Sequence, residues 1–81
     1  MNTRDVLKDW VKDALRRNDG KLRLIDLAKD IWAHHETELK SSGDLFFSWQ
    51  YDMRWAATAL RKAGELEAAN DRGIWQLTSG R

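Results

Sequence analysis

Residues 47–62 hold the side chains with the clearest capacity for chemistry, because polar, basic and aromatic residues recur there at steps of three and four. On a helix this spacing brings them to one side. Basic side chains neutralise phosphates, and an arginine can donate two hydrogen bonds to the edge of a guanine. The pattern therefore predicts contact with double-stranded DNA through Gln50, Tyr51, Arg54, Thr58, Arg61 and Lys62.

The same face has two other interpretations. Phe47, Tyr51 and Trp55 make it unusually aromatic for a surface in contact with water, and aromatic residues are enriched in protein interfaces. A protein-interaction or homodimerisation surface is therefore the alternative function, and a merely solvated face is the third interpretation. Trp55 by itself is better explained as a packing residue, against a following hairpin, than as a ligand contact.

No arrangement of residues in the sequence predicts catalysis. His34 and His35 are adjacent, so on a helix they point about 100° apart and lack the four-residue spacing that lets two imidazoles share a metal. We interpret them as a satisfied surface pair near the end of a helix. The sequence has no cysteine, no glycine-rich phosphate loop and no nucleophile motif, so we expect no enzyme activity, cofactor, bound metal or small-molecule substrate.

Length and composition limit the remaining functions. A chain of 81 residues is expected to form one domain, residues 1–81. No apolar run approaches the roughly 18 residues of a membrane span, and the N-terminal segment lacks a signal-peptide core, so we expect a cytoplasmic protein without a membrane partner. The net charge is only +1, with an excess of +3 in residues 1–23, −2 in residues 24–43 and none in residues 44–81. Any basic surface must therefore be local.

The N-terminal part of the chain predicts a helix followed by a strand. Residues 3–17 carry apolar side chains at helical spacing, and Asn2 or Thr3 can cap this helix. The sequence Asn-Asp-Gly at residues 18–20 ends it, with the glycine as the left-handed residue. Residues 21–24 then alternate over a length typical of a short strand.

Two more helices are predicted in the middle of the chain. An apolar stripe indicates a helix from residue 26 to about residue 35, and the polar residues 35–45 are interpreted as a helix tail and a turn. The third helix begins at Phe46 or Ser48 and ends at Ala63, before a glycine. Its core side is formed by Trp49, Met53, Ala56, Leu60 and Ala63.

A β-hairpin is predicted after the third helix, because apolar and polar residues alternate on both sides of residues 70–73, which have turn chemistry. Arg72 is the cation of this turn that we expect to contact a phosphate. The order helix, strand, helix, helix, strand, strand is that of a winged helix-turn-helix, a mainly α fold with a small β-hairpin. The third helix is then the recognition helix and the hairpin is the wing.

One hydrophobic core should unite these elements. It is predicted from the periodic apolar positions of each element, which are Trp10, Leu27, Ile31, Trp49, Met53, Ala56, Leu60, Trp75 and Leu77.

The C-terminal third of the chain also resembles a known family. The residues that carry the likeness are Trp55-Ala56, Leu60, Ala63-Gly64, Leu66 and the run RGIWQLTSG at residues 72–80. They resemble the winged-helix N-terminal domain of Mrr-type restriction endonucleases and its stand-alone relatives. The resemblance implies a DNA-binding winged helix, normally fused to a nuclease domain that would begin beyond Gly80. Because the chain ends at Arg81, we expect no nuclease residues in it.

Overall fold

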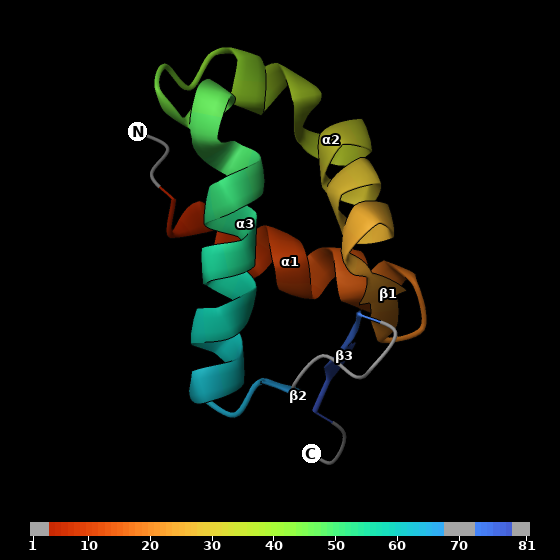
Figure 1. The fold of residues 1–81 in the computed structure, drawn as a ribbon. Helices are drawn as coiled ribbons and strands as arrows, with labels where there is room; N and C mark the ends of the chain where they lie inside the picture. Colours follow the sequence, from red (N-terminus) through yellow and green to blue (C-terminus); the bar gives the residue numbers. More distant parts are fainter. Residues whose placement is uncertain (1–3, 68–72, 79–81) are drawn as a thin grey trace.

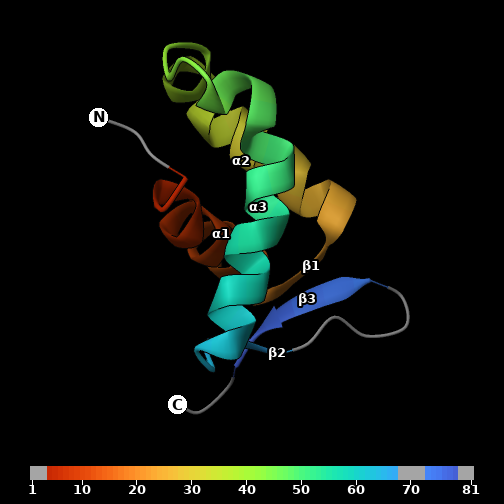
Figure 2. The same ribbon diagram turned by 60° about the vertical axis from the view of Figure 1, so that its left-hand side comes forward.

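The computed structural model describes residues 4–67 and 73–78. The elements follow in the order α1 (Val6–Arg17), β1 (Lys21–Arg23), α2 (Leu24–Lys40), α3 (Leu45–Lys62), β2 (Leu66–Glu67) and β3 (Ile74–Leu77). α1 crosses α3 at a steep angle, and the strands lie at the end of the molecule opposite the turn between α2 and α3 (Figures 1 and 2). The protein is therefore mainly helical with a small antiparallel sheet, as the sequence predicts, and the arrangement is compatible with a winged helix.

α1 begins later than predicted and ends at Arg17, as predicted. It starts at Val6, with Asp5 at the N-cap position, whereas the predicted caps Asn2 and Thr3 lie outside the described residues. At its other end the left-handed conformation is shared by Asp19 and Gly20, with φ of +64° and +88°. Aspartate tolerates the left-handed conformation better than most residues, so it can precede the glycine in this turn. The two residues together turn the chain from α1 into β1.

α2 is longer than predicted and is bent. It continues to Lys40, because Leu39 is fully buried and holds the last turns of the helix against the core. The backbone at His35, with φ of −131° and ψ of 20°, departs from helical values and divides α2 into two parts. The segment interpreted as a helix tail and turn is thus mostly helix, and only Ser41–Asp44 remains to connect α2 with α3.

The end of α3 places the strands that follow. The N–H of Gly64 donates to the carbonyl of Arg61 at 3.0 Å, and the N–H of Glu65 donates to the carbonyl of Leu60 at 2.9 Å. With φ of +82° at Gly64, these two bonds form a Schellman motif, which ends the helix and turns the chain sharply. β2 begins two residues later, so the sheet is tied directly to the last turn of α3.

β3 is the central strand of a three-stranded antiparallel sheet of order β1-β3-β2. Leu22 of β1 is opposite Trp75, and Leu66 of β2 is opposite Leu77. The predicted strand in residues 21–24 is therefore confirmed for Lys21–Arg23, and the sheet links the segment between α1 and α2 to the C-terminal hairpin. The predicted turn at residues 70–73 lies outside the described residues, apart from Gly73.

The core contains the helical positions that the periodicity predicts, with three corrections. Trp75 and Leu77 are half-buried and pack at the edge of the core, because the short sheet lies at one end of the helices (Figure 2). Ala63 is exposed, because it lies beyond the last residue of α3. The other predicted members are buried, and Leu7, Val11, Ala14, Leu15, Leu39, Leu45, Ala57 and Leu66 join them.

Candidate functional site

The outer face of α3 is open to solvent along the whole helix. Phe47 is 84% exposed and Tyr51 is 77% exposed, which are high values for side chains of this size. Of the predicted DNA-contacting residues on this helix, Thr58 is half-buried and the others are exposed: Gln50, Tyr51, Arg54, Arg61 and Lys62. Because the opposite side of α3 is held in the core, this outer face has a fixed orientation.

The charges on this face are mostly basic and available. Within the described part of the chain, Arg54, Arg61 and Lys62 form no ion pair. Asp52 is the one carboxylate within α3, and it accepts a hydrogen bond from Ser48 Oγ at 2.7 Å. Arg61 and Lys62 also lie in the last turn, where the helix dipole favours cations even without a ligand. The face can therefore bind an anion, although two of its cations already have a structural role.

Trp55 forms one margin of this face and packs against the start of α1. The guanidinium carbon of Arg4 lies 4.0 Å from the centroid of its ring, and Lys8 Nζ lies 5.0 Å from it. The indole is half-buried. It is thus a packing residue, as expected, and its described cation–π partners are Lys8 of α1 and Arg4, which lies just before that helix. These contacts also bring two cations beside the outer face of α3.

Arg72, the predicted cation of the wing, lies outside the described residues. The described strands of the hairpin are β2 and β3, where Glu67 and Gln76 are exposed. Glu65, just before β2, accepts a hydrogen bond from Lys12 Nζ at 2.9 Å. This ion pair ties the start of the hairpin to α1 and neutralises the charge of Glu65.

Comparisons with known proteins do not indicate a function for this chain. No protein-family model, curated protein or solved structure matches this chain. Over residues 4–67 and 73–78, no helix is long and apolar enough to cross a membrane. In the same ranges, no three His, Cys, Asp or Glu side chains are grouped so that they could hold a metal ion. The function must therefore be argued from the surfaces themselves.

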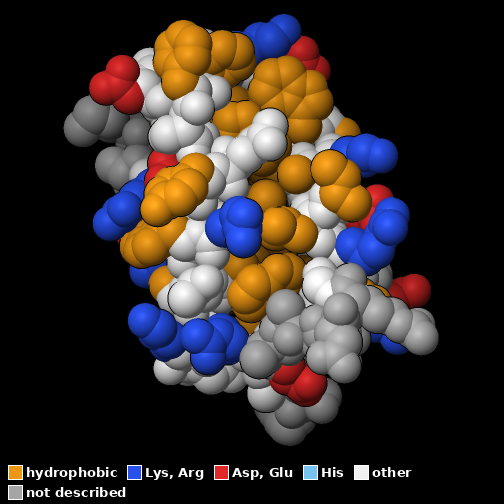
Figure 3. All heavy atoms as spheres, in the orientation of Figure 1, with side chains coloured by type: hydrophobic (Ala, Val, Ile, Leu, Met, Phe, Trp, Pro, Cys, Tyr) orange, Lys and Arg blue, Asp and Glu red, His pale blue; other side chains and the backbone are white. Residues whose placement is uncertain are grey.

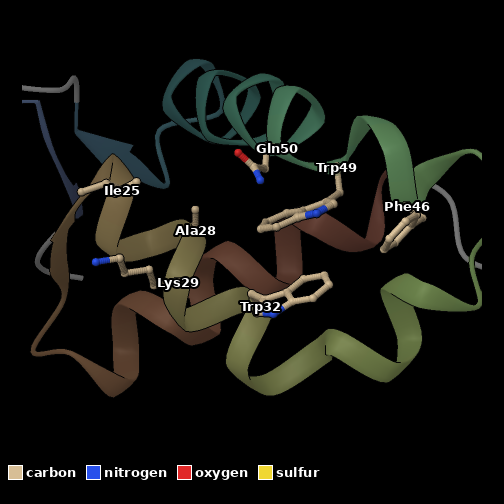
Figure 4. Close-up of a pocket in the computed structure, with 7 residues that line it drawn as sticks. All are labelled: Ile25, Ala28, Lys29, Trp32, Phe46, Trp49 and Gln50. Atoms are coloured by element: carbon tan, nitrogen blue, oxygen red, sulfur yellow. The ribbon is translucent and has the colours of Figure 1, made fainter.

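The sequence analysis missed a second surface, an apolar groove between α2 and α3. Figure 3 shows hydrophobic side chains gathered between these two helices, with lysine and arginine side chains among them. One hollow of about 460 Å³ is lined by Ile25, Ala28, Lys29, Trp32, Phe46, Trp49 and Gln50 (Figure 4). The signal in the sequence was the spacing of Ile25, Ala28 and Trp32, which predicts one face of a helix but not what lies opposite that face.

His35 is also different from its interpretation as half of a surface pair. Its ring stacks on Trp10 of α1, with centroids 3.8 Å apart and planes 8° apart, and it is half-buried. Its Nδ1 lies 2.6 Å from Glu38 Oε1. His34 is exposed, and its Nδ1 lies 2.9 Å from the carbonyl oxygen of Asp30. His35 therefore packs at the bend of α2, while only His34 is a surface residue.

Proposed function

We propose that this protein binds double-stranded DNA through the outer face of α3. The observation that supports the proposal most is the row of exposed cations without ion pairs in the described chain, from Arg54 to Arg61 and Lys62. Arg54 and Arg61 are seven residues apart, which is about 10 Å along a helix. Such a helix fits the major groove, which is about 12 Å wide, so these side chains can reach phosphates on either side.

Specific reading of bases would fall to the residues nearer the start of α3. Gln50 can donate to and accept from an adenine, and at a specific site Arg54 can replace its phosphate contact with two hydrogen bonds to a guanine. The resemblance to Mrr-type winged-helix domains favours the same use of the third helix, with Arg72 of the wing as a further phosphate contact. We propose that the chain binds DNA without cutting it, so a plasmid incubated with the protein and Mg²⁺ should stay intact.

The test is a fluorescence-anisotropy titration with random duplex DNA at several salt concentrations. Arg54→Ala, Arg61→Ala and Lys62→Ala should each weaken binding, because each removes a phosphate contact. The matched control is Arg16→Ala, which removes the same charge from an exposed side chain of α1 that pairs with Asp13 at 2.9 Å. The log–log salt slope should be about −2.7 for three contacts and about −3.6 for four. Absence of binding at low salt, or an equal loss in the control, would contradict the proposal.

The alternative function is a protein-interaction or homodimerisation module that uses the aromatic part of the same face. The exposure of Phe47 and Tyr51 is the observation that favours it, since large exposed aromatic side chains are costly unless a partner covers them. In that case Tyr51→Ala should abolish an oligomer detected by sedimentation, and Arg61→Ala should leave that oligomer unchanged. Such a result together with no DNA binding would favour this alternative.

A further inference from the structure

The groove between α2 and α3 is one continuous surface of two hollows. The second hollow, of about 500 Å³, is lined by Leu24, Ile25, Ala28, Gln50, Tyr51, Met53 and Arg54. It shares Ile25, Ala28 and Gln50 with the first. Ala28 contributes only a methyl group, which leaves room between the helices, and Ile25 is 56% exposed. The groove shares Gln50, Tyr51 and Arg54 with the proposed DNA-binding face, but its other wall is formed by α2, which has no role in the proposed DNA contacts.

The walls of the groove are aromatic and regularly spaced. The indoles of Trp32 and Trp49 face each other with centroids 6.0 Å apart and planes 15° apart, and Phe46 closes the end next to them (Figure 4). On α2 the lining residues extend from Leu24 to Trp32, and on α3 they extend from Phe46 to Arg54. Each wall is therefore about 10–12 Å long, the length of two helical turns. A helix that lies in such a groove uses side chains at i, i+4 and i+7 as anchors.

The charge of the groove selects an acidic occupant. Lys29 lies on the α2 wall and Arg54 on the α3 wall, and within the described part of the chain neither forms an ion pair. Among the described lining residues none carries a carboxylate. Lys40 Nζ also lies 6.0 Å from the ring centroid of Trp32, but its charge is paired with Glu36 Oε2 at 2.7 Å, so Lys29 and Arg54 are the cations that matter for the groove. Apolar walls with cations on both sides match an amphipathic segment whose polar face carries Asp and Glu.

Two other occupants fit less well. Small-molecule sites hold a few buried polar groups that orient the ligand, and among the described residues no polar side chain is buried. A second copy of this chain, related by a two-fold axis through the groove, would place Lys29 and Arg54 against the same cations of its partner, which is unfavourable.

We propose that the groove between α2 and α3 binds an acidic, amphipathic helical segment of a partner protein. Three apolar side chains of the segment pack on Ile25, Ala28 and the stacked indole of Trp32, and its carboxylates pair with Lys29 and Arg54. The affinity comes mainly from the burial of apolar area, and the carboxylates provide the selection between segments.

The probe is a helix-stapled peptide of about 15 residues with leucines at i, i+4 and i+7 and glutamates beside them, since a short unstapled helix is marginal in water. NMR of the whole chain follows the indole N–H signals, which should shift at Trp32 and Trp49. A peptide with glutamine in place of glutamate should bind at least about tenfold more weakly. A peptide with the leucines at i, i+2 and i+5 should not shift these signals.

Two variants test the groove itself. Ala28→Gln fills its floor and Lys29→Glu reverses the charge of one wall, and each should weaken peptide binding by at least about tenfold. The matched control is Lys21→Glu, an exposed lysine of β1 outside the groove, which should bind as the wild type does. Circular dichroism checks that each variant is folded. If Ala28→Gln does not fold, Lys29→Glu still tests the groove, because Lys29 is exposed and its substitution should leave the fold intact.

Three outcomes would overturn the proposal. They are no shift of the Trp32 and Trp49 signals at millimolar peptide, equal binding of the glutamine peptide, and a dimer of the chain that Ala28→Gln abolishes. Failure of the peptide proposal can be distinguished from failure of the DNA proposal. Arg61→Ala should bind the peptide as the wild type does, and Lys29→Glu should bind DNA as the wild type does.

Discussion

Asp30 joins the first two helices through a single carboxylate. Arg17 donates a hydrogen bond to Oδ1, and Asn18 Nδ2 donates to Oδ2 at 2.9 Å. Burial raises the pKa of this carboxyl, but the hydrogen bonds from Arg17 and Asn18 outweigh that effect, so the pKa lies below its ordinary value. Because the lowered pKa means that the folded protein prefers the ionised form, this stabilisation is present above about pH 4 and is lost as the pH falls through the folded-state pKa.

Asp30→Asn should therefore lower the free energy of unfolding at neutral pH by about 1.5–3 kcal/mol, the usual range for hydrogen bonds to a charged group. The difference from the wild type should shrink as the pH falls toward about pH 2, because the wild-type carboxyl is then protonated too. Urea denaturation at several pH values measures it. Asp13→Asn is the matched control, since Asp13 makes an exposed pair with Arg16 that should contribute little. A difference that stays constant with pH would show that Asp30 acts through its shape and not through its charge.

The part of α2 that follows His35 should contribute to the stability of the fold. Leu39 is fully buried there, although the residues around it are polar or charged. Leu39→Ala should lower the free energy of unfolding by about 2–5 kcal/mol, through lost apolar burial and the cavity left behind. Ile25→Ala, on the exposed side of the same helix, should cost much less. Thermal denaturation of the two variants decides between a structural role for residues 36–40 and a frayed tail, for which Leu39→Ala would leave the melting temperature unchanged.

Helical periodicity predicted the elements better than their ends. Apolar residues recur at steps of three and four along most of α3, so the sequence identified its core side. The helix begins one residue before Phe46, the first of the two predicted starts, and ends one residue before the predicted end. Leu39 was missed because one leucine among polar residues has no periodic neighbours. Ala63 was placed in the core because the pattern continues one step too far, and only the Schellman turn at Gly64 shows that the helix has already ended. Trp75 was placed too deep, because alternation gives the face of a strand but not how much covers that face.

At the scale of the whole molecule, a surface made by one helix is easier to predict than one made by two. The outer face of α3 follows from the sequence because its members are three or four residues apart. The groove needs the placement of Trp32 on α2 against Trp49 on α3, and the sequence separation of these residues gives no sign of it. The stacking of His35 on Trp10 is hidden for the same reason, since the two rings come from different helices.

The two proposed surfaces meet at Gln50, Tyr51 and Arg54, which line the groove and also belong to the outer face of α3. A bound acidic segment would pair with Arg54 and cover Gln50, so it should compete with DNA. Saturating stapled peptide should therefore weaken duplex binding and make the salt slope shallower by about 0.9, the value of one lost phosphate contact. By linkage, duplex DNA should weaken peptide binding by the same factor.

Lys29→Glu provides the control for this competition, because it should weaken peptide binding by at least about tenfold and keep DNA binding, so a peptide concentration that saturates only the wild type separates the two proteins. The same anisotropy titration, repeated with this variant, should give a salt slope that the peptide does not change. If the wild type instead forms a ternary complex with an unchanged slope, Arg54 does not serve both partners, and the two surfaces act independently. If the peptide weakens DNA binding to Lys29→Glu as strongly as to the wild type, the competition comes from the charge of the peptide alone and not from its place in the groove.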